Sequence, residues 1–335
     1  MKKNQFLFLA SIFSFLLFAS CRQGQQSNPL SSWNDTPIKT SILNFVDKAV
    51  KEIPVADRIA VFDMDGTITC ETPLWFEMYA AVNGLNQQSS KNPGLLKYPE
   101  YQFARKLARN PADTSVLNHW AIPVNYIDSM VWKAYVGVDH EAYVNTARSY
   151  LLKTKDPKFN IPLSKLFYQP MLELIQYLKA AQFTVYVVSG SMQGVIWSVC
   201  PETLDLNRSN LIGTRQILSP MYKPSEGKTY FIIKKGIFLP KDDGNGKSLN
   251  IYSHIGKVPV FAFGNTNGDF GMFHLTSTSK YPHAEYLLNH DDSIREYAYP
   301  PYHGAPVPHW RDSLLLNKWN LVNMKQAFKV VWMTK

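Results

Sequence analysis

The chain has 335 residues, and 45% of them are hydrophobic, which is enough for one large domain or two smaller ones with a substantial core. Its formal charge of +9 comes from 35 basic and 26 acidic side chains, but the basic residues form no run and no repeat with aromatic residues. This distribution argues against a nucleic-acid-binding protein. The positive charge instead favours an anionic small molecule or phospholipid headgroups as partners.

The N-terminus has the pattern of a secretory signal. Two lysines precede a nearly continuous apolar run over residues 6–19, which is too short to span a bilayer comfortably. The run ends in Phe18-Ala19-Ser20-Cys21, which resembles the lipobox of bacterial lipoproteins, although Phe18 stands where Leu is usual. This resemblance implies cleavage before Cys21 and acylation of its thiol. The alternative is an ordinary cleaved signal with an incidental cysteine.

We therefore predict a signal peptide over residues 1–20 and a polar, lipid-anchored tether over residues 21–40. The protein is then expected in the periplasm or cell envelope of a bacterium, with the membrane as a partner through Cys21. Loss of the two leader lysines leaves 33 basic and 26 acidic residues, a formal charge of +7. Export permits a disulfide between Cys70 and Cys200, but two thiols leave that pairing open.

Two aspartates directly follow an apolar run near residue 60. Residues 59–62 predict a buried strand, and Asp63-Met64-Asp65-Gly66-Thr67 predicts the polar loop at its carboxyl end. Ligands of open α/β sheets bind beyond the carboxyl ends of the strands, so both carboxylates are expected at the rim of a site. The alternative is a simple turn, since Asp and Gly are common turn residues.

An Asp-x-Asp-Gly-Thr sequence after a hydrophobic strand resembles the first motif of the haloacid-dehalogenase (HAD) superfamily of phosphohydrolases. The resemblance implies that Asp63 attacks phosphorus, and that Asp65 protonates the leaving oxygen and then activates water. It also implies phosphate contacts from Gly66 and Thr67. A carboxylate nucleophile divides one hard displacement into two easier steps when an acid protonates the leaving group and a cation screens the substrate.

Helical patterns surround this strand. Apolar residues at every third or fourth position over residues 41–53 predict a helix before it. After Thr67, some ninety residues contain helical stretches near residues 74–82, 101–108, 124–136 and 140–152. In the HAD superfamily a cap inserted at this point excludes water and contributes specificity. We therefore predict a helical cap over residues 71–159 and a core formed by residues 41–70 and 160–335.

Glu71 and Trp75 stand at the predicted junction of core and cap. Glu71 is a candidate contact for a cationic group of the substrate. Trp75, Phe76 and Tyr79 are candidates for cation–π contact with an ammonium. The structural alternative is that these aromatic residues pack the first cap helix, which is the preferred interpretation for them, with Glu71 favoured at the N-terminal end by the helix dipole. For Glu71 both interpretations stay open.

A second strand and its loop resemble the second HAD motif. Residues 168–181 predict a helix, and residues 183–188 predict a strand that ends in Ser189-Gly190-Ser191. Ser189 and Gly190 are then expected to hold phosphoryl oxygens through a hydroxyl group and backbone amides. Residues 211–239 mix short strand-like runs with Gly and Pro, and they predict a hairpin on the core.

Lys247 is the candidate for the third-motif lysine, which pairs with the nucleophile and the phosphate. It opens a predicted helix that ends at Gly256, after the evident loop at residues 242–246. Its spacing before the next motif favours it over Lys228 and Lys257.

Gly264-Asn265-Thr266-Asn267-Gly268-Asp269 follows a predicted strand over residues 258–263 and resembles the fourth HAD motif, whose acidic residues hold Mg²⁺. Asn265 replaces the first acidic residue, as in an exported subset related to phosphoserine phosphatase. The resemblance implies Mg²⁺ bound by Asp63, the carbonyl of Asp65, Asn265 and Asp269, since this ion prefers oxygen ligands. The lost charge is expected to weaken metal affinity.

The segment Asn289-His290-Asp291-Asp292 and the pattern around Trp319 also resemble this subset. His290 and Asp291 are candidate contacts near the phosphate, but a structural role is the preferred interpretation. A metal cluster is not expected there, because no other His or Cys lies at ligand spacing.

Together the motifs predict an α/β fold with a Rossmann-like core, a mainly parallel sheet with helices on both faces, and an inserted helical cap. The predicted function is Mg²⁺-dependent hydrolysis of phosphate monoesters of small metabolites outside the cytoplasm, through a phospho-aspartyl intermediate. The alternatives are a phosphotransferase or phosphomutase of the same fold and a non-catalytic, lipid-anchored binding protein. A dehalogenase is disfavoured because it needs neither Asp65 as acid and base nor Asp269.

Overall fold

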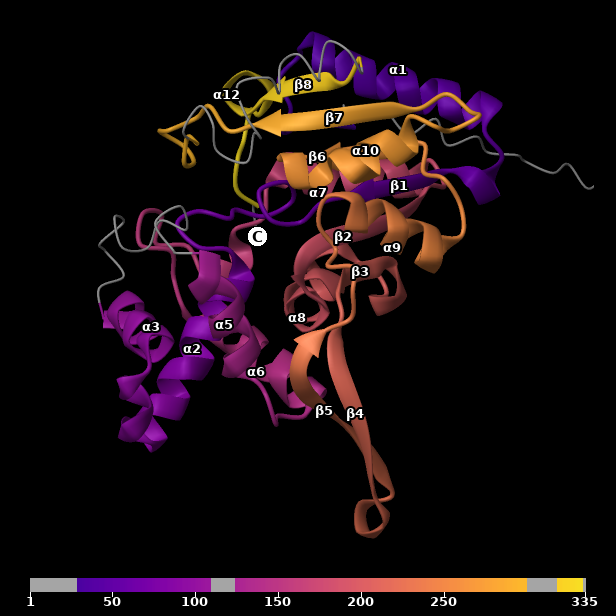
Figure 1. The fold of residues 1–335 in the computed structure, drawn as a ribbon. Coiled ribbons are helices and arrows are strands. Elements are labelled where there is room, and N and C mark those ends of the chain that lie inside the picture. Colours follow the sequence, from indigo (N-terminus) through magenta and orange to yellow (C-terminus); the bar gives the residue numbers. More distant parts are fainter. Residues whose placement is uncertain (1–28, 110–123, 300–317, 334–335) are drawn as a thin grey trace, which may run out of the picture.

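The computed structural model describes residues 29–109, 124–299 and 318–333. Its centre is a six-stranded sheet in the order β3-β2-β1-β6-β7-β8, in which every neighbouring pair is parallel (Figure 1). The strands are β1 (Ile59–Phe62), β2 (Thr184–Met192), β3 (Leu211–Thr214), β6 (Phe261–Gly264), β7 (Ala284–Asn289) and β8 (Asn320–Asn323). The strand order reverses beside β1, and ligands of such sheets bind at the carboxyl ends of the strands near this reversal.

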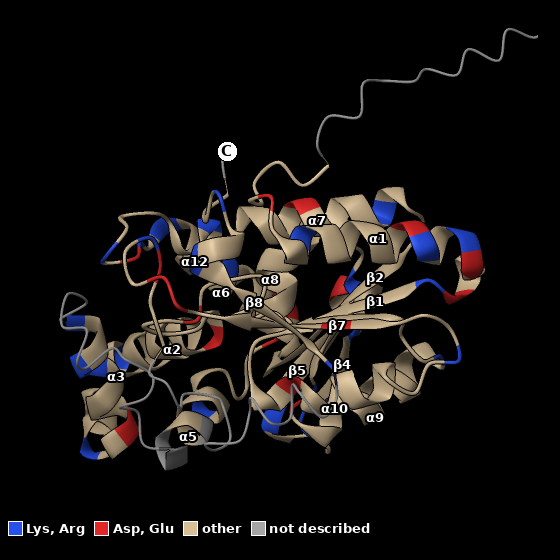
Figure 2. Cartoon of the chain, turned by 90° about the horizontal axis from the view of Figure 1, so that it is seen from above, with Lys and Arg blue, Asp and Glu red and all other residues tan. Residues whose placement is uncertain are grey.

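Helices cover both faces of the sheet. Successive side chains of a strand point to opposite faces, so each face presents apolar side chains that the helices bury. Phe62 belongs to the apolar cluster shared with α1 and α7, and Val61 to the cluster shared with α9 and α10 (Figure 2). The bounds are α1 (Pro37–Glu52), α7 (Gln169–Ala180), α9 (Asn245–Ile255) and α10 (Phe270–Thr276). All four residues of β1 are buried, as expected for a strand covered on both faces. This architecture confirms the predicted α/β class with its parallel core.

Between β1 and α7, the described residues form four α-helices that lie together beside the sheet (Figure 1). They are α2 (Phe76–Lys91), α3 (Pro99–Arg109), α5 (Val124–Ala134) and α6 (His140–Lys153). We refer to this group as the cap helices. Their apolar faces join the core cluster of α1 and α7, so the cap helices pack continuously with the core. The described residues also form α8 (Gln193–Leu204), which follows β2, and the short α12 (Met324–Ala327).

The segment at residues 211–239 differs from its predicted hairpin. Leu211–Thr214 is fully buried and pairs with β2 in the main sheet. The hairpin itself is formed by β4 (Gln216–Lys223) and β5 (Lys228–Ile237), which pair antiparallel and project from the core. Ile233 of β5 exchanges backbone hydrogen bonds with the loop before α6, since its N–H donates to Val138 at 2.9 Å and its carbonyl accepts from Gly137 at 2.9 Å. The hairpin is therefore attached to the cap helices.

Residues 29–40 differ from the predicted tether. Leu30 and Trp33 are buried, and the indole Nε1 of Trp33 donates to the carbonyl of Pro170 at 2.9 Å. The backbone N–H of Ser32 donates to Glu173 at 2.8 Å. Two apolar side chains in a polar stretch thus fix this segment against the core. The predicted signal peptide, Cys21 and the rest of the tether lie outside the described residues. Within the described part of the chain, no helix combines the length and the apolar character that crossing a bilayer requires.

Gly271 sets how closely α10 approaches the loop before α9. A Cβ atom at this position would lie 2.1 Å from the carbonyl oxygen of Gly244. We expect Gly271→Ala to lower the free energy of unfolding by about 1–3 kcal/mol, because the backbone must move to admit the methyl group. Urea unfolding followed by circular dichroism measures this. The control Leu249→Ala, at a half-exposed position of α9, is expected to change it by no more than about 0.5 kcal/mol. Equal stability of G271A and the parent would contradict the close packing.

Candidate active site

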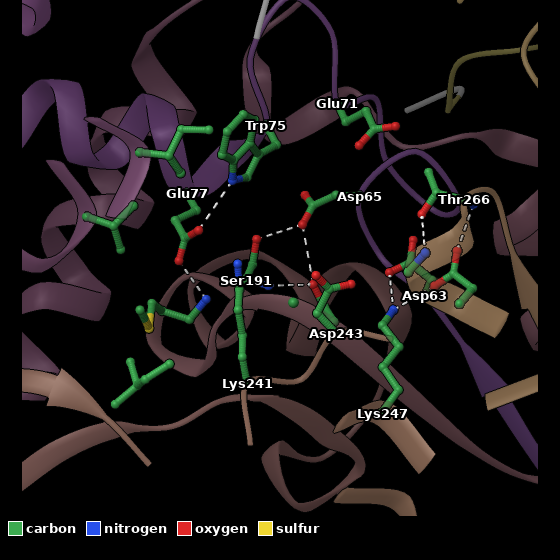
Figure 3. A pocket seen from close by; sticks show the side chains of 18 of the residues that line it. Asp63, Asp65, Glu71, Trp75, Glu77, Ser191, Lys241, Asp243, Lys247 and Thr266 are labelled. Atoms are coloured by element: carbon green, nitrogen blue, oxygen red, sulfur yellow. Dashed lines mark hydrogen bonds and ion pairs between the residues drawn. The ribbon is translucent and has the colours of Figure 1, made fainter. Parts of the chain in front are cut away.

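Side chains from the ends of neighbouring strands meet around one cavity of about 270 Å³ (Figure 3). Asp63 and Asp65 follow β1, and Ser189 lies near the end of β2. Lys247 lies in the first turn of α9, and Asp269 follows β6. The backbone N–H of Asp63 donates to the carbonyl of Phe263 at 2.9 Å, so the pairing of β1 with β6 brings the two acidic loops side by side.

Lys247 is at the centre of this arrangement. Its Nζ donates to Asp63 Oδ1 at 2.6 Å, to Asp269 Oδ1 at 2.7 Å and to the carbonyl of Val188 at 2.7 Å. These three acceptors use all three N–H donors of the ammonium group. Burial lowers the pKa of Lys247, but the charges of Asp269 and Asp63 more than offset this effect and raise it overall. The side chain therefore stays protonated.

The surroundings of Asp63 act on its pKa in opposite directions. Burial and the neighbouring charge of Asp269 raise the pKa of Asp63 to about 8, while Lys247 acts in the other direction. Its second oxygen, Oδ2, is buried and finds no hydrogen-bond donor among the described residues. A buried carboxylate oxygen without a donor is costly unless a cation approaches it. The residues therefore fit a metal ion at this oxygen.

The carboxylate of Asp269 is held by its own loop. Its Oδ2 accepts from the backbone N–H of Asn265 at 2.8 Å and of Thr266 at 2.9 Å. Among the described residues, no group of three His, Cys, Asp or Glu side chains is arranged to hold a metal. The predicted ligand set contains only two such side chains, Asp63 and Asp269, with the carbonyl of Asp65 and the amide of Asn265. It stays a prediction.

Asp65 is contacted by two hydroxyl groups from the end of β2. Its Oδ2 accepts from Ser191 Oγ at 2.6 Å and from Ser189 Oγ at 3.3 Å. Burial raises the pKa of Asp65 to about 7, against the effect of the Ser191 hydroxyl, and the charge of Glu77 raises it further. A carboxyl group with a pKa near 7 is suited to give and take a proton at neutral pH.

Gly66 and Thr67 use their predicted phosphate-binding donors inside the loop. The N–H of Gly66 donates to Thr69 at 2.7 Å, and the N–H of Thr67 donates to Met64 at 3.2 Å. The hydroxyl of Thr67 donates to Asn265 at 3.2 Å. Neither residue lines the cavity, whereas Ser189 and Gly190 do. The phosphate contacts predicted for all four residues stay a prediction.

Asn265 and Glu71 are joined beside the glycine of the first loop. Asn265 Nδ2 donates to Glu71 Oε1 at 2.8 Å, and burial raises the pKa of Glu71 well above its usual range. A Cβ atom on Gly66 would lie 2.0 Å from this Nδ2 and 2.4 Å from the Glu71 oxygen, and Gly66 also has a φ of +79°. Only glycine fits here. Glu71 thus supports the loop as well as lining the cavity.

His290 lies behind the same loop and does not line the cavity. Its Nε2 is 2.6 Å from the carbonyl oxygen of Gly66, and its Nδ1 is 3.2 Å from Glu296 Oε2. Its ring stacks on Tyr299 at 3.9 Å between centroids. Asp291 is exposed and accepts from the backbone N–H of Lys325 at 2.8 Å. Both contacts agree with the preferred structural interpretation.

The alternative lysines lie elsewhere. Lys228 is exposed on the hairpin, and Lys257 forms an ion pair with Asp57 at 2.7 Å. Cys70 and Cys200 are both buried and free. The thiol of Cys70 donates to Glu296 at 3.2 Å, while Cys200 contacts the sulfur of Met64 at 3.5 Å, so the structure contains no disulfide between them.

Several residues of the cavity were not predicted from the sequence. The carboxylates of Glu77 and Asp243, the indole of Trp132 and the hydroxyl of Ser191 all line it, together with Trp75, which was predicted. Ser191 belongs to the Ser-Gly-Ser sequence that pointed to the second motif, so a signal for it existed. Glu77 lies in the first turn of α2, where an acidic residue is ordinarily explained by the helix dipole.

The fold and the site define an α/β protein in which one lysine forms ion pairs with carboxylates at the ends of two neighbouring strands. The chain belongs to the haloacid dehalogenase-like hydrolase (HAD) family, whose family model matches residues 60–274. This match confirms the family suggested by the motifs and the hydrolase class. No curated protein matches the chain.

The solved structures that match the chain share little of its sequence. A functionally unknown protein from Anaerococcus prevotii has 15% identity and a TM-score of 0.48, covering 76% of this chain and 86% of its own. A cytosolic 5'-nucleotidase IIIB bound to cytidine has 13% identity and a TM-score of 0.41, covering 76% and 79%. A probable phosphoserine phosphatase from Vibrio cholerae has 11% identity and a TM-score of 0.41, covering 89% and 70%.

The raised pKa of Asp65 makes stability depend on pH. The folded protein keeps this proton up to about pH 7, whereas the unfolded chain loses it near the ordinary value of 3.8. The stability that the group contributes is therefore complete at low pH and is lost as the pH rises through 7. In metal-free buffer we expect Asp65→Asn to raise the melting temperature relative to the parent more at pH 8 than at pH 4.5.

Differential scanning calorimetry at the two pH values measures this difference. The control Asp47→Asn replaces an exposed carboxylate and is expected to shift the melting temperature equally at both. A pH-independent effect of D65N would show that Asp65 titrates normally in the folded protein.

Proposed function

We propose that the protein is a Mg²⁺-dependent phosphate-monoester hydrolase that acts through a phospho-aspartyl intermediate on Asp63. The observation that best supports this function is the contact of Lys247 with both Asp63 and Asp269, in a cavity that also contains Asp65 and Ser189. This arrangement supplies a nucleophile, an acid and base, and positive charge within one small space.

Each residue has a distinct part in the proposed reaction. An oxygen of Asp63 attacks phosphorus in line, and the bond from phosphorus to the ester oxygen breaks. Asp65 gives its proton to that oxygen, so the alcohol leaves neutral. Asp65 then takes a proton from water as the water attacks the phospho-aspartate, which releases inorganic phosphate and restores Asp63. We propose that the hydroxyl of Ser189, which donates to Asp65 in the structure, donates to a phosphoryl oxygen once the substrate has entered.

Positive charge is the main electrostatic requirement of this reaction. Burial and the charge of Asp269 raise the pKa of Asp63 despite the contact with Lys247, so a further cation at this carboxylate would favour its ionised form. We propose that Asp63 Oδ2, Asp269, the carbonyl of Asp65 and Asn265 hold Mg²⁺. When bound, Mg²⁺ would screen the charge of the phosphate.

The cavity of about 270 Å³ suits a small phosphorylated metabolite. On the N-terminal sequence we also propose export and acylation of Cys21. A phosphotransferase or phosphomutase would use the same groups with a different acceptor, and comparing phosphate release with transfer to an added alcohol separates these reactions.

Turnover of phenyl phosphate is expected to require a divalent cation. Treatment with EDTA should lower the rate of phosphate release at least about tenfold, and Mg²⁺ should restore it, because a second cation beside Asp63 favours its ionised form and screens the phosphate. A colorimetric phosphate assay measures this. Full activity after exhaustive chelation would contradict the metal dependence.

Asp63→Asn is expected to lower kcat at least about 10³-fold, because an amide cannot form the acyl phosphate. The same phosphate assay measures kcat, and circular dichroism checks that the variant is folded. Asp47→Asn serves as the matched control at an exposed site and should keep parental activity. Parental turnover in D63N would refute the proposed nucleophile.

A further inference from the structure

The cavity has two chemically different parts. The charged groups of the proposed phosphate site lie on one side, on the loops after β1, β2 and β6. The rest of the lining contains six apolar side chains, half of which come from the cap helices, beside Glu71, Glu77, Lys241 and Asp243. These apolar residues are Trp75, Ile127, Val131, Trp132, Met192 and Ile237. The leaving group of a phosphate ester would lie against this part of the lining.

Glu77 brings a carboxylate to this part of the lining. The residue is 7% exposed, and its Oε1 accepts from the backbone N–H of Met192 at 2.7 Å. Its Oε2 accepts from the indole Nε1 of Trp75 at 3.3 Å (Figure 3). Two donors on separate elements thus fix the orientation of the carboxylate and couple it to one of the two indole rings.

Glu77 is also close to the proposed acid. Ser191 donates its hydroxyl to Asp65, and the next residue, Met192, donates its backbone N–H to Glu77. Adjacent residues of one strand therefore connect the two carboxylates. Under the proposed function, Asp65 faces the ester oxygen of the leaving group. Atoms a few bonds beyond that oxygen then face Glu77 and the indoles.

In the part of the chain that the structure describes, the cavity offers few cations for a second anionic group of a substrate. Among the lining residues that the structure describes there is no arginine, and the lysines are Lys247 and Lys241. Lys247 is hydrogen-bonded to Asp63 and Asp269, and Lys241 is exposed on the loop after the hairpin. A leaving group with its own carboxylate or phosphate would therefore lie close to Glu77 without a fixed cation of its own.

We infer that the preferred substrate is the phosphate ester of an amino alcohol, whose ammonium group is held by Glu77 and the indoles of Trp75 and Trp132. This inference rests on the proposed function and narrows its substrate class. A buried carboxylate fixed by two hydrogen bonds beside apolar side chains attracts a cation more strongly than it would in water. Indole faces add cation–π attraction for a primary or quaternary ammonium.

Comparison of matched esters tests this inference. With Mg²⁺ present, kcat/KM is measured for 2-aminoethyl phosphate, for n-propyl phosphate as its uncharged counterpart, for phosphoserine and for phenyl phosphate. We expect kcat/KM for 2-aminoethyl phosphate to exceed that for n-propyl phosphate at least about tenfold, and to exceed that for phosphoserine.

The variant Glu77→Gln separates charge from structure. A glutamine side chain can still accept the N–H of Met192, but it carries no charge. We expect E77Q to bring the ratio of kcat/KM for 2-aminoethyl and n-propyl phosphate close to one. Glu52→Gln, at an exposed position of α1, is the matched control and should leave this ratio at its parental value.

The results with the four esters distinguish a wrong substrate class from a wrong proposed function. Release of phosphate from phenyl phosphate without preference for the aminoethyl ester, or with preference for phosphoserine, would overturn the inference alone. An equal loss of kcat/KM for both alkyl esters in E77Q would assign Glu77 a structural role and also overturn it. Absence of release from all four esters would overturn the proposed function and this inference with it.

Discussion

A buried ammonium group between two carboxylates is the interaction on which the rest of the site depends. Lys247 is 2% exposed, and its contacts with Asp63 and Asp269 join helix α9 to the loops after β1 and β6. Removing one member of such a group leaves a buried charge uncompensated. The strand order makes the group possible, because only neighbouring strands bring their end loops this close. The Nζ atom of Lys247 therefore both contacts the proposed catalytic carboxylate and holds these elements of the fold together.

Much of the fold could be predicted from the sequence, because the loops that contain the motifs follow short, strongly apolar strands. Residues 59–62 form β1 as predicted, and Asp63, Asp65, Ser189, Lys247 and Asp269 meet around one cavity. The failures have physical reasons. Leu211–Thr214 has only four residues, so its pattern does not distinguish a central strand from one arm of a hairpin. The Asn-containing strand Asn320–Asn323 has little strand propensity and is held by β7.

The finer chemistry of the site depends on the directions in which its N–H groups and side chains point. The order of residues in the sequence does not reveal these directions. Gly66 and Thr67 occupy the expected loop, but their N–H groups point to Thr69 and Met64. The role of Glu71 in packing against Gly66 depends on a contact with Asn265, which lies 194 residues away in the chain. Glu77 lies in a first helical turn, as many surface glutamates do, and its burial and its contacts with Met192 and Trp75 distinguish it from them.

The docking of Trp33 against the core has a consequence for how far the protein can reach. If Cys21 is acylated as we propose, only residues 21–28 separate the lipid from the part of the chain fixed by Leu30 and Trp33. Eight residues extend over at most about 30 Å. The folded domain would then stay within a thin layer next to the bilayer. There it would encounter metabolites released at the membrane surface before they diffuse away.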